Sequence, residues 1–154
     1  MRLSVCAFLL AGLAASTLAR AEPVKPDPAH IPFKLPKDIK WTIDPNFGEE
    51  NANLVGDPSK PGPYVMLIRW KPHQMSRPHY HNTARNVYVV SGTWWVSDSG
   101  HYDPDKTYPL PAGSFGIDMP GQIHWDGAKD EPVVLELMGI GPADTIKVAD
   151  TGKK

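Results

Sequence analysis

The sequence has one cysteine, Cys6, among 154 residues. Cys6 lies in a segment typical of an export signal: Met1–Arg2 gives a positive start, an apolar run extends from Leu3 to Leu18, and Ala19-Arg20-Ala21 is a small-residue cleavage site. We predict a signal peptide over residues 1–21, whose removal leaves a chain without any thiol. This excludes disulfides, cysteine nucleophiles and cysteine metal ligands, so a bound metal must use nitrogen or oxygen ligands.

The sequence also lacks an apolar run long enough to span a bilayer. The run from Leu3 to Leu18 is shorter than the roughly 20 residues that a membrane helix needs, and it includes Gly12, Ser16 and Thr17. A membrane anchor is the alternative interpretation, and cleavage is favoured over it. We therefore expect a periplasmic or secreted protein with no membrane contact after the signal is removed.

No charge of one sign dominates. Sixteen Lys and Arg residues face 17 Asp and Glu residues, for a formal net charge of −1. This balance excludes a nucleic-acid binder that works by general attraction to phosphates. The hydrophobic content of 41% is too high for a disordered chain. The composition favours a single folded domain with a hydrophobic core.

Helical patterning is missing after the signal, and 17 Pro and 13 Gly residues interrupt the chain. Five prolines within residues 22–38 predict an extended Pro-rich arm. Residues 39–150 are predicted to form one all-β domain, an antiparallel sandwich or barrel, because short β-rich runs alternate with turn signals. The predicted strands are Trp41–Ile43, Tyr64–Trp70, Val87–Val90, Thr93–Ser97, Phe115–Ile117, Val133–Met138 and Ile146–Ala149.

Three histidines form the strongest chemical pattern. His79 and His81 are two residues apart, so on an extended segment both imidazoles lie on one face and can share a cation. An isolated pair of this kind is more often a polar surface strand. His124 adds weight, because it follows a Pro120-Gly121 turn directly after a predicted strand.

Two ordered motifs contain these histidines. The first is His79-x-His81, then Arg85, then six residues to Gly92; the second is Gly113, then Gly121, two residues and His124. The pattern resembles the two signature motifs of the cupin superfamily over roughly residues 70–138. The resemblance implies a cupin fold, a double-stranded β-helix or jelly-roll barrel, and homodimers are common in that family.

The resemblance also implies a metal site. Cupins hold a divalent transition metal with three His and one Glu, so His79, His81 and His124 are the metal candidates here. Three neutral imidazoles suit Fe, Mn, Ni, Cu or Zn, and some cupins use three His alone. The first motif departs from the family at His73, where Gly is usual, which makes His73 a loop residue rather than a ligand.

Arg85 stands where the family has its Glu ligand. A guanidinium is always charged, so it is costly beside a dication unless an anion lies between them. Three arrangements remain open. Arg85 holds an anionic substrate bound to the metal; or no metal binds and Arg85 helps to hold an anion; or Arg85 turns outward into a surface ion pair.

A replacement carboxylate is a further question. The run Val133–Met138 alternates, with Glu136 on the face opposite Leu135 and Leu137. If that face lines the barrel, Glu136 could pair with Arg85 or act as a general base; if it faces solvent, it has no such role. Asp118 and Asp126 flank His124 and could orient its imidazole, although aspartates in turns are common.

These observations favour an exported metal-dependent cupin enzyme, dioxygenase-like or isomerase-like, acting on a small anionic or enolisable molecule. Arg85 and Glu136 are its candidate catalytic residues. The first alternative is a metal-free cupin that binds or senses a small anion, and the second is a structural or storage role. Metal content separates the enzyme from both alternatives, because function does not follow from the fold alone.

Overall fold

The computed structural model describes residues 25–152. The predicted signal peptide at 1–21 and the first residues of the predicted arm lie outside them. The chain divides into two units, residues 1–33 and 34–154. Among residues 25–33, a turn is closed by backbone bonds from His30 and Ile31 to Asp27. No helix among the described residues is both long enough and apolar enough to cross a membrane.

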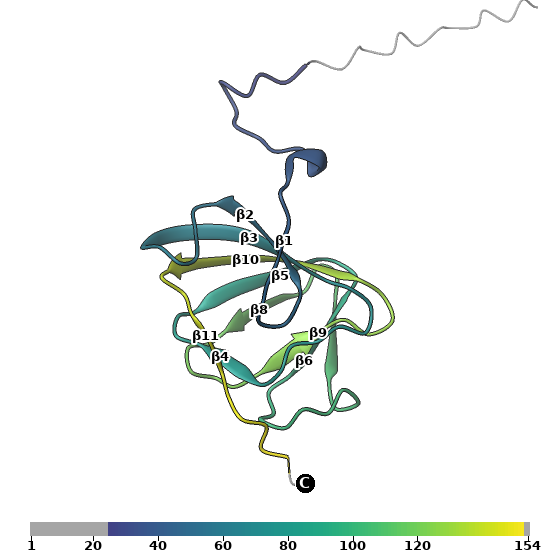
Figure 1. Cartoon of the computed structure of the whole chain (residues 1–154). Helices are drawn as coiled ribbons and strands as arrows, with labels where there is room; N and C mark the ends of the chain where they lie inside the picture. The colour runs from purple at the N-terminus through teal and green to yellow at the C-terminus, as the bar shows by residue number, and fades with distance from the viewer. Residues whose placement is uncertain (1–24, 153–154) are drawn as a thin grey trace, which may run out of the picture. The chain divides into compact units, whose positions relative to one another are not determined.

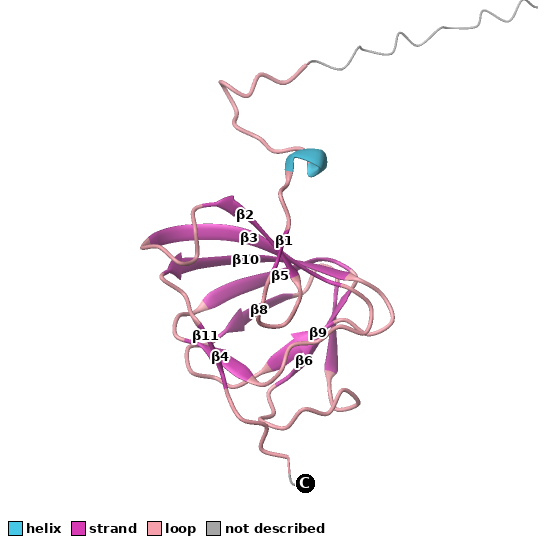
Figure 2. Cartoon of the chain, viewed as in Figure 1, coloured by secondary structure: helices cyan, strands magenta, loops and turns pink. Residues whose placement is uncertain are grey.

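The second unit begins with a short 3-10 helix, η1 (Pro36–Asp38), and is otherwise built from antiparallel strands (Figures 1 and 2). Its largest sheet has six strands in the order β1-β2-β3-β10-β5-β8. These strands are β1 (Thr42–Ile43), β2 (Glu50–Val55), β3 (Gly62–Trp70), β10 (Val133–Gly141), β5 (Arg85–Ser91) and β8 (Phe115–Asp118).

Two smaller sheets complete the unit. One pairs β11 with β4, and the other has the order β7-β6-β9. Their strands are β4 (His79–His81), β11 (Thr145–Lys147), β6 (Thr93–Ser97), β7 (Tyr108–Pro111) and β9 (Trp125–Gly127). In Figure 2 the strands of the small sheets lie across from the large sheet, which is the sandwich-like barrel that the turn-rich composition predicts.

The core lies between these sheets because the central strands alternate. In β3 every second side chain from Tyr64 to Trp70 is buried, and in β10 the same holds for Val133, Leu135 and Leu137. Alternating burial of this kind fixes the register, since a slip of one residue would expose the whole apolar set. Trp94 is buried and the adjacent Trp95 is only half-buried, as opposite strand faces require.

Each of the seven predicted strand ranges overlaps a strand of the structure, and the all-β prediction is confirmed. The sequence does not predict the other four strands, β2, β4, β7 and β9. Strand β2 has the sequence ENANLV, which is poor in the β-branched and aromatic residues that mark strands. Strand β7 contains Pro109 and Pro111 and is an edge strand, the place in a sheet that tolerates proline.

The turn between β5 and β6 explains the glycine at its centre. Gly92 has a φ of 75°, a left-handed conformation that side chains disfavour. A Cβ atom there would also collide with the backbone carbonyl oxygen of Pro132, just before β10. The turn therefore requires glycine for two reasons: its own left-handed backbone and the close approach of a second segment.

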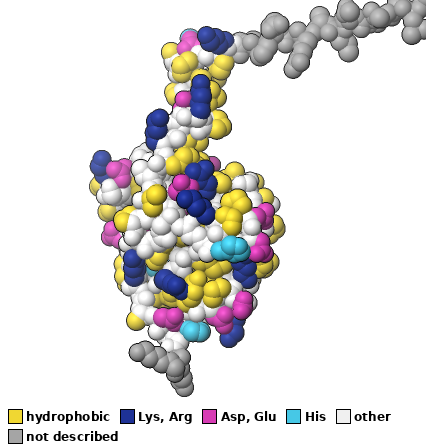
Figure 3. All heavy atoms as spheres, turned by 45° about the vertical axis from the view of Figure 1, so that its right-hand side comes forward, with side chains coloured by type: hydrophobic (Ala, Val, Ile, Leu, Met, Phe, Trp, Pro, Cys, Tyr) yellow, Lys and Arg dark blue, Asp and Glu magenta, His cyan; other side chains and the backbone are white. Residues whose placement is uncertain are grey.

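The molecular surface carries both signs of charge. On the face drawn in Figure 3, Lys and Arg side chains are interspersed with Asp and Glu side chains and with apolar groups. This mixture matches the near-balanced composition of the sequence.

Candidate metal centre

The three predicted histidines come together in the structure. His79 and His81 lie on β4 with both side chains buried, while Tyr80 between them is half-buried on the other face. His124 directly precedes β9 and is also buried. One ring nitrogen from each histidine lies within 4.8 Å of those of the other two. The geometry predicted from the H-x-H spacing and the Pro-Gly turn is therefore present.

Backbone hydrogen bonds hold the two motifs side by side. His79 and His124 form an isolated antiparallel bridge, in which each backbone nitrogen donates to the other carbonyl oxygen at 2.9 Å. The Gly121 nitrogen donates to the carbonyl oxygen of His81, also at 2.9 Å. The turn that Gly121 permits is thus tied directly to β4, which sets the position of His124.

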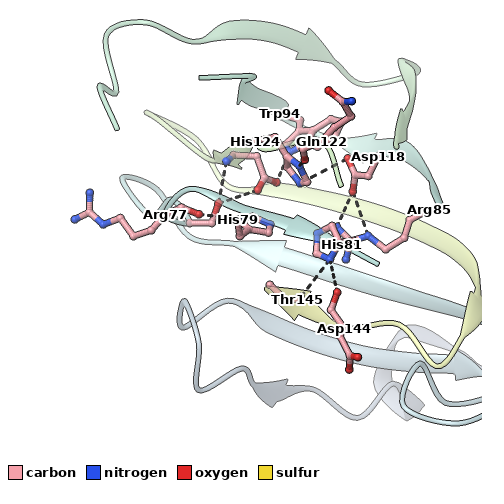
Figure 4. A network of polar contacts seen from close by, with 12 residues as sticks. Arg77, His79, His81, Arg85, Trp94, Asp118, Gln122, His124, Asp144 and Thr145 are labelled. Atoms are coloured by element: carbon pink, nitrogen blue, oxygen red, sulfur yellow. Dashed lines mark hydrogen bonds and ion pairs between the residues drawn. The ribbon is translucent and has the colours of Figure 1, made fainter. Parts of the chain in front are cut away.

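The hydrogen bonds of the rings fix their tautomers. Nδ1 of His79 lies 2.7 Å from the Arg77 carbonyl oxygen, and Nδ1 of His124 lies 3.0 Å from that of Gln122. Nδ1 of His81 lies 3.2 Å from the carbonyl oxygen of Asp144 (Figure 4). A carbonyl oxygen only accepts, so Nδ1 carries the proton in each ring and Nε2 keeps a free lone pair.

Burial keeps the rings of His79 and His81 neutral. Desolvation lowers the pKa of His81 to about 2, with further lowering by the charges of Arg85, His79 and His124. Desolvation also lowers the pKa of His79, and the neighbouring His124 and Arg85 act in the same direction. Neutral imidazole is the form that binds a metal ion.

The donor set therefore fits a divalent transition metal. Three Nε2 lone pairs converge, and each ring is oriented by a bond from Nδ1 to a carbonyl oxygen, the usual arrangement around metal-bound histidine. Nε2 of His81 is fully buried and has no hydrogen-bond partner among the described residues. A buried unpartnered lone pair is costly, and a bound cation would remove that cost.

Arg85 does not turn outward, and its side chain is only 14% exposed. Its Nε and Nη2 both donate to Oδ2 of Asp118, at 3.2 and 2.6 Å. The two residues are register partners on β5 and β8. Of the arrangements left open by the sequence, the ion pair is present, but it is buried inside the barrel rather than on the surface. The edge of the guanidinium expected to hold an anion is therefore already in use.

Asp118 and Asp126, which flank His124, do not accept a hydrogen bond from Nδ1 of His124. Oδ1 of Asp118 lies 3.8 Å from Nε2 of His124, on the metal-facing side of the ring. Asp126 accepts bonds from Ser76 Oγ at 3.0 Å and from Trp94 Nε1 at 2.6 Å. The ring of His124 is oriented instead by the carbonyl of Gln122.

Glu136 is not brought to the histidines. It lies half-buried on β10, on the face opposite the core residues Leu135 and Leu137. Its register partners are Leu67 and Tyr88, and it lines none of the three cavities that a site histidine lines. Of the two alternatives open for Glu136, the structure places it away from the barrel interior.

Glu49 is the carboxylate that the sequence analysis missed. It directly precedes β2, is only 6% exposed, and lines a cavity of about 540 Å³ together with His81, Arg85 and Tyr64. Burial raises the pKa of Glu49 to about 7, and the charges of Asp44 and Asp126 add to this. The only signal in the sequence was an acidic residue beside the polar run ENANLV, which itself was not predicted as a strand.

His73 explains one departure from the cupin motif. It has a φ of 61°, the only positive value for a non-glycine residue among those described, and its side chain is exposed. The position thus keeps the backbone conformation that suits the family's glycine. The prediction that His73 is a loop residue is confirmed.

Comparison with known structures supports the fold. The polyketide cyclase RemF from Streptomyces resistomycificus is similar with a TM-score of 0.61 and 16% identity, covering 76% of this chain and 86% of that one. A cupin-like protein from Thermotoga maritima has a TM-score of 0.53 and 20% identity, covering 73% and 90%. The DMSP lyase DddQ from Ruegeria pomeroyi has a TM-score of 0.58 and 13% identity, covering 75% and 64%.

The comparison with curated proteins finds no match. At identities this low, the similar structures establish the fold alone. The model of the ChrR Cupin-like domain matches residues 34–144, which is most of the chain. Together with the motif glycines, the jelly-roll sheets and the three clustered histidines, this match shows that the chain belongs to the ChrR cupin-like family of the cupin superfamily.

Proposed function

We propose that this protein is an exported metal-dependent cupin enzyme that acts on a small, enolisable or anionic molecule. The observation that carries the proposal is the convergence of three buried imidazoles, each oriented through Nδ1 by a backbone carbonyl. The metal is a divalent transition ion such as Fe, Mn, Ni, Cu or Zn. Bound there, it would supply Lewis-acid polarisation of a substrate oxygen.

The cavity beside the histidines supports a small-molecule substrate. Its volume of about 540 Å³ lies in the usual range for small-ligand sites. Met66 and Ile68 form an apolar part of the wall, and Tyr64 and Arg85 contribute polar groups. The apolar wall limits water around the reacting group, and the polar groups orient it.

The charge distribution favours an enolisable substrate over a strongly anionic one. Arg85 is already neutralised by Asp118, and the cavity wall also includes Asp44, Glu49 and Asp144. A metal-free pocket built to hold an anion would leave its arginine without such a partner. The buried ion pair therefore counts against the alternative of a metal-free anion sensor.

Metal analysis tests the proposal. We expect roughly one transition-metal ion per chain in protein purified without a histidine tag, and loss of that ion in His79→Ala/His124→Ala. His101→Ala is the matched control, because His101 is exposed and pairs with Asp150. If the wild-type protein binds none of Fe(II), Mn, Ni, Cu and Zn, the metalloenzyme proposal is wrong.

Export and catalysis need their own measurements. The amino-terminal residue of the protein purified after expression of the full chain tests the signal peptide, with Glu22 expected and Met1 contradicting export. Oxygen-consumption and isomerisation screens with small keto and hydroxy acids test catalysis once the metal is identified. Loss of each activity in the double histidine variant, and not in His101→Ala, is the expected result.

A further inference from the structure

Glu49 is held in place by a tight turn ahead of β2. The Asp44 nitrogen donates to the carbonyl oxygen of Glu49 at 2.7 Å, and the Gly48 nitrogen donates to the carbonyl oxygen of Asp44 at 3.0 Å. Gly48 has a φ of 84°, which the turn requires. The backbone of Glu49 is therefore fixed while its side chain is buried in the barrel.

Two cavities connect Glu49 with the metal centre. The cavity of about 540 Å³ is lined by Glu49, His81 and Arg85. A second cavity of about 30 Å³ is lined by the same three residues and by His79. This smaller space is large enough for an ion or a water molecule and too small for a substrate.

Two buried acceptors and one buried donor, Nε1 of Trp70, have no partners in the described part of the chain and belong to residues that line this small cavity. Among the described residues, neither Oε2 of Glu49 nor Nε2 of His81 has a hydrogen-bond partner, and both atoms are fully buried. Nδ1 of His81 carries the proton, so its Nε2 has only a lone pair to offer. While Glu49 is ionised, both atoms are acceptors and cannot satisfy each other, and a cation between them would satisfy both.

The charges point to the same conclusion. Two other buried carboxylates lie near the histidines, and both have partners: Arg85 neutralises Asp118 through two hydrogen bonds, and Asp126 accepts hydrogen bonds from Ser76 and Trp94. Glu49 has no salt bridge in the part of the chain that the structure describes. An uncompensated buried carboxylate is unusual in a protein interior unless it binds a cation.

We propose that Glu49 is the carboxylate ligand of the metal centre, supplied from the turn before β2 and not from the motif position, which Arg85 occupies. This inference rests on the proposed metal-binding function. The close group of donor atoms contains the three histidines alone, so the Glu49 side chain must turn within the cavity that it lines to reach the ion. Its negative charge also offsets the repulsion between the ion and Arg85.

The ligand role has a consequence for the chain around Glu49. An ion bound by Glu49 and the histidines would join the turn at 44–49 to β4 and to the segment before β9. Metal binding should therefore slow amide hydrogen exchange at the nitrogens of Asp44 and Gly48, whose bonds close this turn. Binding by the histidines alone would slow exchange there no more than at amides far from the site.

Titration with Co(II) alone tests the proposal in the purified chain. Glu49→Gln keeps the size of the side chain and removes its charge. Glu50→Gln is the matched control, since the neighbouring Glu50, the first residue of β2, pairs with Arg69. We expect Glu49→Gln to bind Co(II) on the order of 100-fold more weakly than wild type, with an altered visible spectrum, and Glu50→Gln to match wild type.

The possible outcomes separate this inference from the proposed function. If Glu49→Gln binds Co(II) with wild-type affinity and spectrum, Glu49 is not a ligand, while the three-histidine centre stands. If wild type itself binds neither Co(II) nor the other transition metals, both proposals are wrong. Should Glu49→Gln fail to fold, Glu49→Asp replaces it, with weaker binding and an altered spectrum expected, and the exchange measurement on wild type decides independently.

Discussion

The two ends of the six-stranded sheet treat their buried charges in opposite ways. On the β5–β8 side, Arg85 and Asp118 neutralise each other through two hydrogen bonds. On the β1–β2 side, Glu49 is equally buried and has no partner for Oε2 among the described residues. The paired charges hold the barrel wall in one geometry, whereas the unpaired charge costs stability, as expected of a residue that serves binding rather than folding.

Breaking the satisfied pair should have the largest effect. Asp118→Asn leaves the buried guanidinium of Arg85 without a countercharge, and we expect the free energy of unfolding to fall by about 3–5 kcal/mol. Urea denaturation measures this directly. Arg85→Met/Asp118→Leu should recover most of the loss, because it removes both charges. A fall below about 1 kcal/mol in Asp118→Asn would show that the pair is effectively solvated.

Removing the charge of Glu49 should instead increase the free energy of unfolding of the metal-free protein near pH 7. Burial raises the pKa of Glu49 from 4.5 to about 7, so between these values the unfolded chain ionises while the folded one stays protonated. The folded protein thus loses stability as the pH rises from about 4.5 to about 7, by about 3 kcal/mol at most.

Glu49→Gln lacks this titration. Its free energy of unfolding relative to wild type should be roughly constant below pH 4.5 and should increase, in favour of the variant, as the pH approaches 7. Urea denaturation of both proteins in the presence of a metal chelator, across this pH range, measures the difference between their free energies of unfolding. A difference that is independent of pH would contradict the raised pKa.

Loss of the hydrogen bond from Trp94 to the buried Asp126 should have a smaller effect on stability. Trp94→Phe removes the donor at 2.6 Å from Oδ2 of Asp126, while Ser76 still donates to Oδ1. We expect a loss of about 1–2 kcal/mol in the free energy of unfolding. Trp95→Phe, on the half-buried face of the same strand, serves as control and should lose less.

Glu136 should show the smallest effect. It lies on the outer face of β10, away from both cavities. Glu136→Gln should change the free energy of unfolding by less than about 0.5 kcal/mol and leave metal affinity unaltered. A large loss of metal binding in this variant would restore Glu136 as a site residue.

The sequence predicted the histidine centre because its information is local. The H-x-H spacing places two rings on one strand face, and the Pro120-Gly121 turn places His124. Short-range geometry therefore determines most of the arrangement of the three rings. The alternation Val133–Met138 likewise separated the core face from the face of Glu136. The prediction was less complete where two distant segments had to meet.

Register and turns account for what was missed. The pairing of Arg85 with Asp118 depends on the β5–β8 register. The residues of these two strands do not predict that register. Glu49 was overlooked because it directly precedes β2, whose first four residues are Glu, Asn, Ala and Asn; their low β-propensity gives no sign of a strand there. Glu49 is buried only because the barrel closes around it, and the neighbouring sequence does not predict that burial.

The reciprocal backbone bridge between His79 and His124 has a consequence for when metal can be acquired. The two residues are distant in sequence, so this long-range pairing must form before three imidazoles meet. An unfolded chain offers only the neighbouring pair His79 and His81, a much weaker chelator. A metal ion would therefore bind the folded state preferentially and stabilise it in proportion to the logarithm of its concentration. Under the proposed function, folding comes first and the folded chain then selects its ion from the surroundings.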